Sequence, residues 1–295
     1  MIILDTVAHE TIWGGQRLMP FAKGEHPNIG HLYSLCCEKG LENHILNGKF
    51  KGKVFQEYFL SVRDKYGLSM YDEFPLIIAL VEPKMDLSIQ VHPDDQMAVN
   101  EEHAQYGKNE SWYFLDTPES REIYNGCLAA SKEEFREKME QNDVLSVVDR
   151  LPVKKGDYVY VEAGTIHALS SGCLLYEIEE NSPWTYRIYD YNRIDSEGNK
   201  RELHVEKALR ALKPQLKSKA YPMGDSPIEE RRYVVQRIIY ANEYTNVSKT
   251  LECITMIEGK CIIENISFTT GTTVVLEPGE TLVGDIRHAV MARPK

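Results

Sequence analysis

The stretch Gly156-Asp-Tyr-Val-Tyr-Val-Glu-Ala-Gly164 has the pattern of an alternating strand between two glycine turns, and the fold can be inferred outward from it. The same arrangement returns at a constant offset in Gly271-Thr-Thr-Val-Val-Leu-Glu-Pro-Gly279. Repeated short strands that end in glycine turns are typical of an all-β jelly roll or sandwich. The position that corresponds to His167 in the second copy is Leu282, so we expect chemistry in the first copy only.

Short strands with Gly and Pro turns continue along most of the chain, and helices are few. Ser131 followed by Glu134 matches the spacing of a helix capping box. The apolar patterns predict strands at 74–80, 87–91, 112–115, 151–161, 173–178, 185–191 and within 232–295, and helices at 50–68, within 94–107, from 131 onward and at 203–212. We therefore predict a mainly β fold with a few helices.

The chain of 295 residues is long enough for one or two domains. Residues 214–230 contain Pro, Ser and Lys without a clear period, which indicates a linker. We predict a first domain over 1–213 and a smaller β domain over 231–295.

The composition narrows the class of protein. Hydrophobic residues make up 42% and charged residues 27% of the chain, which is ordinary globular usage. The net charge of −11 argues against nucleic acid or a membrane surface as the main partner. An anionic small substrate is compatible with this charge only in a locally basic pocket.

Neither the ends of the chain nor its cysteines indicate export. Residues 1–20 lack the basic and apolar segments of a signal peptide, and no apolar run reaches the roughly 18 residues that span a bilayer. The six cysteines form no Cys-x-x-Cys pair. We therefore predict a cytoplasmic protein with reduced thiols.

Four residues could hold a metal ion. Gln90 and His92 alternate in one strand and so point to the same face. Glu110 precedes a strand, and His167 follows the glycine turn at 164. An amide, a carboxylate and two imidazoles suit zinc, manganese or cobalt. There is no His-x-x-x-His or similar spacing, and a single histidine in a β protein is usually a hydrogen-bonded or surface residue.

Arg187 stands in an aromatic strand, where a buried guanidinium is costly unless it is paired. Two explanations are open at this point. The side chain forms a structural ion pair with Glu177 or Asp190, or it binds an anion.

Several ordered motifs together resemble the type I mannose-6-phosphate isomerases, in a short bacterial form without the large helical insertion. The motifs are Trp13-Gly-Gly15, Ser88-Ile-Gln-Val-His-Pro-Asp-Asp95, Gly107-Lys-Asn-Glu-Ser-Trp112, Pro152-Val-Lys-Lys-Gly-Asp157, Ala163-Gly-Thr-Ile-His167 and Tyr186-Arg-Ile-Tyr-Asp-Tyr-Asn-Arg193. The resemblance implies a cupin jelly-roll barrel followed by a second, smaller cupin-like β domain. It also implies one divalent metal, usually zinc, held by Gln90, His92, Glu110 and His167.

The same resemblance implies an enzyme that interconverts mannose 6-phosphate and fructose 6-phosphate through a cis-enediol. The family's catalytic groups correspond to Arg187, Lys108 and Glu177. Arg187 would stabilise the enediolate or bind the phosphate, and Lys108 would add a second positive charge. Glu177 is a candidate base, with His92 or a metal-bound water as alternatives.

Some positions depart from the family pattern. The family's Gly-Glu-Ser-Trp-Glu-Ile-Ser corresponds here to Gly30-His-Leu-Tyr-Ser-Leu-Cys36, so His31 and Tyr33 replace a glutamate and a tryptophan. Glu162 and Asn109 also differ from the usual proline and threonine. No expected ligand is lost, but the sugar could differ. The alternatives are an isomerase of another sugar or sugar phosphate and a sugar-binding cupin without catalysis, and the oligomeric state stays open.

Overall fold

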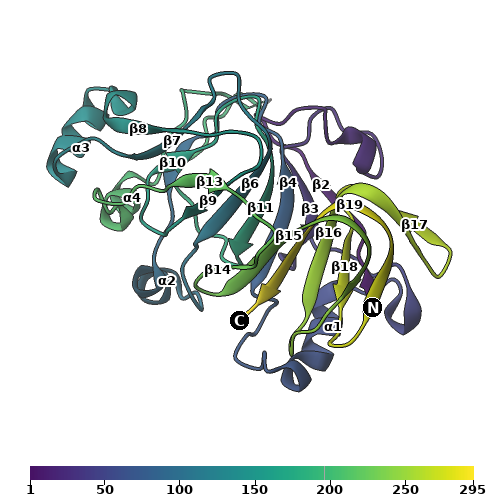
Figure 1. Cartoon of the computed structure of the whole chain (residues 1–295). Coiled ribbons are helices and arrows are strands. Elements are labelled where there is room, and N and C mark those ends of the chain that lie inside the picture. Colours follow the sequence, from purple (N-terminus) through teal and green to yellow (C-terminus); the bar gives the residue numbers. More distant parts are fainter. Residues whose placement is uncertain (196) are drawn as a thin grey trace. The chain divides into compact units, whose positions relative to one another are not determined.

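The computed structural model describes residues 1–195 and 197–295, and strands dominate it (Figure 1). The prediction of a mainly β fold with few helices is confirmed. Contacts within the chain define two compact units, one comprising 1–10, 16–80 and 223–295, the other comprising 11–15 and 81–222. Among the described residues, no helix has the length and apolar character to cross a bilayer.

The second unit contains strands of two antiparallel sheets. One has the order β12-β5-β10-β7-β8, and the other includes β13-β9-β6-β11. The strands are β5 (Ile89–Val91), β6 (Glu110–Asp116), β7 (Glu122–Cys127), β8 (Val148–Pro152), β9 (Asp157–Val161), β10 (His167–Ala168), β11 (Leu174–Glu180), β12 (Tyr186–Tyr189) and β13 (Ala220–Pro222). The helices are α2 (Asp95–Glu102), α3 (Lys132–Glu140), α4 (Val205–Ala211) and the 3₁₀ turn η4 (Val144–Val147).

The first unit is built around a sheet of order β1-β18-β16-β19-β15-β14, with β17 paired to β16. Its strands are β1 (Ile2–Ile3), β14 (Ile228–Glu229), β15 (Tyr233–Thr245), β16 (Glu252–Ile263), β17 (Ile266–Phe268), β18 (Thr273–Leu276) and β19 (Thr281–Pro294). It also contains β2 (Val7–His9), β3 (His31–Leu35), most of β4 (Leu76–Val81), α1 (Phe55–Val62) and the 3₁₀ turns η1 (Met19–Phe21), η2 (Gly48–Phe50) and η3 (Arg63–Tyr66).

Local sequence signals explain where several elements begin and end. The Ser131 hydroxyl accepts the backbone N–H of Glu134 at 3.1 Å, as the capping-box spacing predicts. The Glu134 carboxylate reaches the N–H of Ala130 rather than that of Ser131. The helix predicted over 50–68 is α1 followed by η3. It ends at Gly67, whose φ of 71° lies in the left-handed region that favours glycine.

One sequence prediction about the second half of the chain needs correction. The single strand predicted over 151–161 is wrong, because β8 ends at Pro152 and β9 begins at Asp157 after a turn at Gly156, where φ is 88°. The segment predicted as a linker, 214–230, carries β13 and β14, which pair with β9 and β15. The division into domains over 1–213 and 231–295 stays a prediction. One division between the compact units, between residues 222 and 223, falls inside the predicted linker, but residues 1–10 and 16–80 belong to the same unit as the C-terminal segment.

Candidate metal centre

Strand alternation gives the sheet of β5, β10 and β12 one apolar and one polar face. The apolar side chains Ile89, Val91, Ile166, Ala168, Tyr186 and Ile188 are buried in one cluster with Phe135 of α3 and Leu209 of α4. Gln90, His167 and Arg187 lie between them in sequence and so point to the other face. Helix packing on one side of the sheet thus turns these polar residues to the other side.

The strand register places these residues in one row. Gln90 of β5 is the Cα partner of both His167 on β10 and Arg187 on β12. His167 is in turn the partner of Asn125 on β7. Directly opposed residues of neighbouring strands share a face, so the four side chains form a row across four strands.

The other sheet supplies a carboxylate that meets this row. Glu110, the first residue of β6, has its carboxylate oxygens 3.1 Å from His92 Nε2 and 3.3 Å from His167 Nε2. Gln90 Nε2 lies 3.3 Å from the same nitrogen of His167. His92, Glu110 and His167 are at most 2% exposed. Residues distant in the sequence therefore converge at one buried point.

Hydrogen bonds at the far side of each imidazole fix its tautomer. His92 Nδ1 donates to the carbonyl of Trp184 at 3.0 Å, and His167 Nδ1 donates to the carbonyl of Thr165 at 2.9 Å. A carbonyl can only accept, so Nδ1 carries the proton in both rings. Burial lowers the pKa of His92 to about 3 and that of His167 to about 4, so both rings are neutral near pH 7.

The neutral rings direct two Nε2 lone pairs at a carboxylate. Acceptor atoms at 3.1 and 3.3 Å from one another repel unless a positive charge lies among them. A divalent cation placed among these atoms would bind all of their lone pairs. Imidazole together with carboxylate is a common ligand set for zinc. The three residues have ligand atoms within 4.8 Å of one another. The donor set therefore fits a divalent metal.

Lys108 lies next to this cluster because the backbone at Gly107 and Lys108 packs closely against that of Pro93. Its N–H donates to the carbonyl of Pro93 at 3.1 Å, and the N–H of Gly107 donates to the Asp95 carboxylate at 2.9 Å. A Cβ at Gly107 would lie 2.4 Å from the Pro93 oxygen, so only glycine permits this approach. The glycine thus brings the segment that carries Lys108 and Glu110 against the end of β5.

Buried charges surround the Lys108 ammonium. Its Nζ lies 2.9 Å from a carboxylate oxygen of Glu179 on β11. Burial alone would lower the pKa of Lys108, but the carboxylates of Glu179, Glu110 and Glu177 raise it. Lys108 is therefore a fixed positive charge beside Glu110.

Glu177 lies on β11 directly opposite Trp112, whose indole N–H donates to it at 2.8 Å. Burial raises the pKa of Glu177 well above its usual value, and the Glu179 and Glu110 carboxylates add to this shift. Ligand oxygens of Glu110, Glu177 and Glu179 lie within 4.8 Å of one another. Glu177 is thus a buried carboxyl group that holds a proton more readily than a free glutamate does.

Arg187 forms no ion pair with Glu177 or Asp190 among the described residues. Its Nε donates to Ser88 Oγ at 3.3 Å and its guanidinium donates to the carbonyl of Glu202 at 2.9 Å. Asp190 instead binds Arg193 and Arg201. Of the two explanations left open by the sequence, the structural ion pair is therefore wrong.

Positive charge accumulates around Arg187. Burial and the nearby guanidinium groups of Arg201 and Arg193 lower its pKa, although Asp190 opposes the shift. Three guanidinium groups lie near two carboxylates, the buried Asp190 and the exposed Glu202, so the cluster carries an excess of positive charge. Since Arg187 is the register partner of Gln90, this excess adjoins the row of candidate ligands.

Sequence reasoning missed several residues that support this cluster. Glu179 was not identified, although Glu177 and Glu179 alternate on one face of an apolar strand, which is the only local signal. The contacts of Asn109 and the Trp184 carbonyl depend on segments distant in sequence. His31 and Tyr33 lie on β3 of the first unit, where their rings stack 5.4 Å apart.

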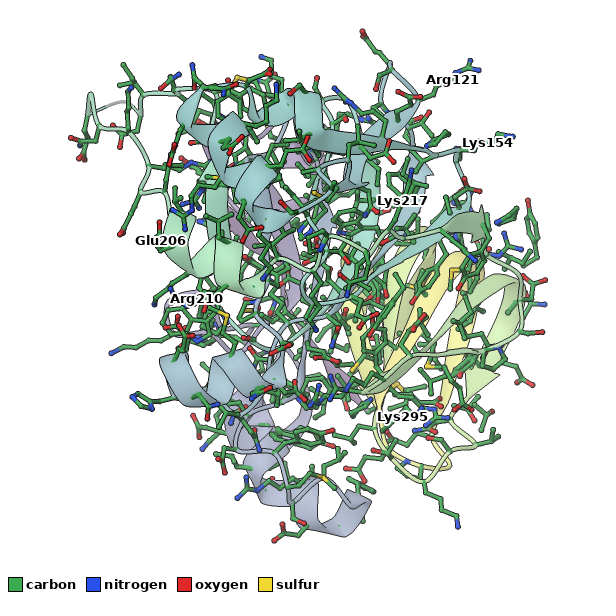
Figure 2. All side chains as sticks on the ribbon, turned by 90° about the vertical axis from the view of Figure 1, so that its left-hand side faces the viewer. Arg121, Lys154, Glu206, Arg210, Lys217 and Lys295 are labelled. Atoms are coloured by element: carbon green, nitrogen blue, oxygen red, sulfur yellow. The ribbon has the colours of Figure 1, made fainter. Side chains whose placement is uncertain are left out.

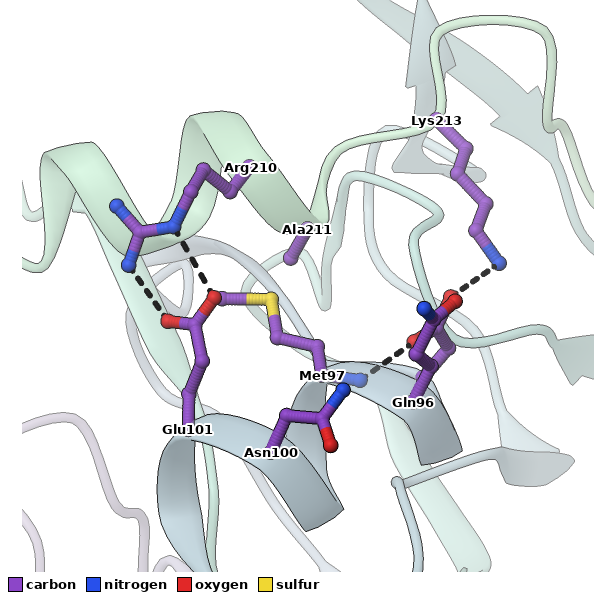
Figure 3. Close-up of a pocket in the computed structure, with 8 residues that line it drawn as sticks. Gln96, Met97, Asn100, Glu101, Arg210, Ala211 and Lys213 are labelled. Atoms are coloured by element: carbon purple, nitrogen blue, oxygen red, sulfur yellow. Dashed lines mark hydrogen bonds and ion pairs between the residues drawn. The ribbon is translucent and has the colours of Figure 1, made fainter.

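Two surface hollows contain none of the candidate site residues. One, of about 260 Å³, lies between α2 and α4 (Figure 3), and its charges are already paired as Arg210 with Glu101 and Lys213 with Asp94. A larger one, of about 650 Å³, is lined partly by Arg121 and Lys154, which project outward from neighbouring turns in Figure 2. Unlike these two hollows, the basic cluster at Arg187 lies beside a candidate metal ligand, Gln90.

Comparisons with known proteins identify the family of the chain. Residues 1–119 match the family model for the phosphomannose isomerase type I catalytic domain. The mannose-6-phosphate isomerase ManA of Bacillus subtilis (strain 168) is 36% identical over 212 residues, which cover 72% of this chain and 67% of that protein. This degree of identity over two thirds of a relative indicates common descent.

Solved structures extend the likeness over the whole chain. The crystal structure of the mannose 6-phosphate isomerase from Bacillus subtilis is 30% identical, covers 99% of each chain and has a TM-score of 0.85. A mannose 6-phosphate isomerase bound with zinc and yttrium has the same fold, with a TM-score of 0.65 at 12% identity, over 100% of this chain and 99% of that one. The predicted cupin-type fold class is confirmed by these matches. The chain therefore belongs to the type I mannose-6-phosphate isomerase family.

Proposed function

We propose that this chain interconverts mannose 6-phosphate and fructose 6-phosphate by proton transfer through a cis-enediol. Membership of the family supports the reaction, because the curated relative described above is named for it. The observation that carries the proposal is the pair of neutral imidazoles whose Nε2 lone pairs face the Glu110 carboxylate.

Zinc, held by Gln90, His92, Glu110 and His167, is the metal that we propose. A related fold is known bound with zinc, and the donor set suits that ion. Gln90 would ligate through its amide oxygen after a turn of the amide, since its nitrogen now lies beside His167. The metal would polarise the sugar's carbonyl oxygen and hold it in place.

Arg187 supplies positive charge on the substrate side of the row. Its guanidinium, backed by Arg193 and Arg201, attracts the phosphate or the negative oxygen that develops in the enediolate. The bonds to Ser88 and the Glu202 carbonyl fix its direction without neutralising it.

Glu177 is the proton carrier in this proposal. Burial raises its pKa above that of a free carboxyl group, which favours its use as the group that gives and accepts the proton during the transfer between C2 and C1. The Trp112 indole holds the carboxyl in place, and Lys108 offsets the charge of the neighbouring carboxylates.

The test is formation of fructose 6-phosphate from mannose 6-phosphate in a coupled assay, with metal-stripped and zinc-restored protein side by side. We expect turnover to disappear on stripping and to return with zinc. A folded, zinc-loaded protein without turnover would reject this substrate pair. Mannose and other aldose phosphates, assayed in parallel, would then show whether another sugar is used.

A further inference from the structure

Asn109 lies between Lys108 and Glu110, and its side chain makes contacts to two other segments. Its Nδ2 donates to a carboxylate oxygen of Glu180 at 2.8 Å, and its Oδ1 accepts the backbone N–H of Ala163 at 2.9 Å. Its carbonyl also accepts the N–H of Glu180 at 2.9 Å. Asn109 is 2% exposed and Glu180 is fully buried. This side chain therefore joins β6, the end of β11 and the turn before β10.

The turn that Asn109 binds also holds both candidate histidine ligands. The N–H of Gly164 donates to the carbonyl of His92 at 3.0 Å. The carbonyl of the next residue, Thr165, accepts Nδ1–H of His167 at 2.9 Å. Three consecutive residues, 163–165, thus contact the three segments that carry His92, Glu110 and His167.

We infer that Asn109 is a positioning residue of the metal centre, which fixes Glu110 relative to the 163–165 turn and, through the turn, relative to both histidines. Of the three contacts described above, the one to Asn109 runs through a side chain that is not itself a candidate ligand. The inference rests on the metal site of the proposed function. Groups that orient ligands are expected to change metal affinity by about ten- to a hundred-fold when altered.

The chemistry of the contact explains why an amide suits this position. The side chain must accept from Ala163 and donate to Glu180 at the same time, and both partners are buried. An aspartate at position 109 could still accept the N–H of Ala163. Its other carboxylate oxygen, however, would face the negative carboxylate of Glu180 and be repelled by it. Asn109→Asp should therefore disrupt the contact, and Glu180→Gln should restore it, because the new amide at 180 can donate to the new carboxylate at 109.

The measurement is the zinc dissociation constant by chelator competition, together with the melting temperature of the metal-free protein. We expect Asn109→Asp and Asn109→Ala to weaken zinc binding about ten-fold or more. The double variant Asn109→Asp/Glu180→Gln should bind zinc within about three-fold of the unchanged protein. That rescue is not expected if Asn109 serves stability alone.

Asn246→Ala is the matched control. Asn246 is equally buried and donates to the carbonyls of Thr250 and Leu276 in the first unit. It should lower the melting temperature without changing zinc affinity. If the Asn109 variants resemble this control, the positioning role is rejected. If the unchanged protein itself fails to bind zinc, the metal site of the proposed function is rejected instead.

Discussion

The direction of two imidazole rings separates this site from an ordinary pair of buried histidines. His92 and His167 both donate from Nδ1 to a backbone carbonyl and turn Nε2 toward the Glu110 carboxylate, an acceptor that does not satisfy a neutral Nε2. The Gln90 amide nitrogen also lies 3.3 Å from Nε2 of His167. Alternation and a glycine turn made these residues candidates in the sequence, and the family resemblance was needed to prefer them as ligands. The carbonyls that set their tautomers were not predictable, because Trp184 is distant from His92 in the chain and backbone acceptors leave no residue-type signal.

His167→Ala removes one imidazole from the centre of the row. We expect metal content to fall well below one ion per chain and turnover to be lost, because the remaining donors leave the cation short of a ligand. The measurement is metal analysis after gel filtration, with the coupled assay beside it. His103→Asn is the control, because His103 is exposed and its φ of 53° is one that asparagine tolerates. Full metal content in His167→Ala would contradict the site.

Arg187→Ala removes positive charge without removing a proposed ligand. We expect metal content to be unchanged and kcat/KM to fall by about a hundred-fold or more, because a donor to a developing negative charge is lost. Arg187→Lys should recover only part of the loss, since an ammonium cannot form the same paired contacts. A loss of less than about three-fold in Arg187→Ala would return this side chain to a structural role.

At the level of helices and strands, sequence periodicity predicted which segments form elements better than it predicted the residues at which they begin and end. The strand at Leu76–Val81 and the helix that begins after Ser131 lie close to where apolar patterns and caps indicate. The run 151–161 was read as one strand because both halves are apolar, although Pro152 and Gly156 interrupt it. Strand pairing was the unpredictable part, since the register that aligns Arg187 with Gln90 depends on contacts between distant segments.

The second glycine-strand-glycine unit uses its acidic residue to hold a helix. Glu277 accepts hydrogen bonds from Tyr58 of α1 at 2.8 Å, from Tyr66 and from the Lys65 ammonium at 3.1 Å. Burial opposes ionisation, but these donors lower the pKa of Glu277 from 4.5 to about 2. In the second copy of the repeat, 271–279, which has no candidate metal ligand, the acidic residue Glu277 therefore has a structural role.

Glu277→Gln tests that role through pH. Because the folded-state pKa is depressed, the ionised carboxylate stabilises the fold above about pH 4.5, and this stabilisation is lost as pH falls toward 2. We expect the variant to melt at a lower temperature near pH 7 and to lose less stability between these pH values than the unchanged protein. Melting curves across the pH range measure this. Glu243→Gln, at an exposed position of β15, should leave the curve unchanged.

Across the whole chain, the two ends of the sequence build one sheet. Ile2 and Ile3 pair with Val275 and Val274 of β18, and Ile3 is fully buried in a cluster that includes Val234 and Ile254. Sequence reasoning placed residues 1–213 in one domain because the linker composition at 214–230 was the only visible boundary. A strand of two residues carries no periodic signal, so its partner at the other end of the chain could not be inferred.

Removal of residues 231–295 distinguishes these two descriptions of the chain. If the C-terminal segment were an independent domain, a fragment of residues 1–230 would fold and bind metal. We expect it instead to aggregate or to melt without cooperativity, because Ile2 and Ile3 would lose their partners on β18, and each buried aliphatic side chain contributes about 1.5–3 kcal/mol. Gel filtration and thermal melting by circular dichroism measure the outcome. A monomeric fragment with a sharp transition and one bound zinc would show that the predicted domain boundary is the correct one.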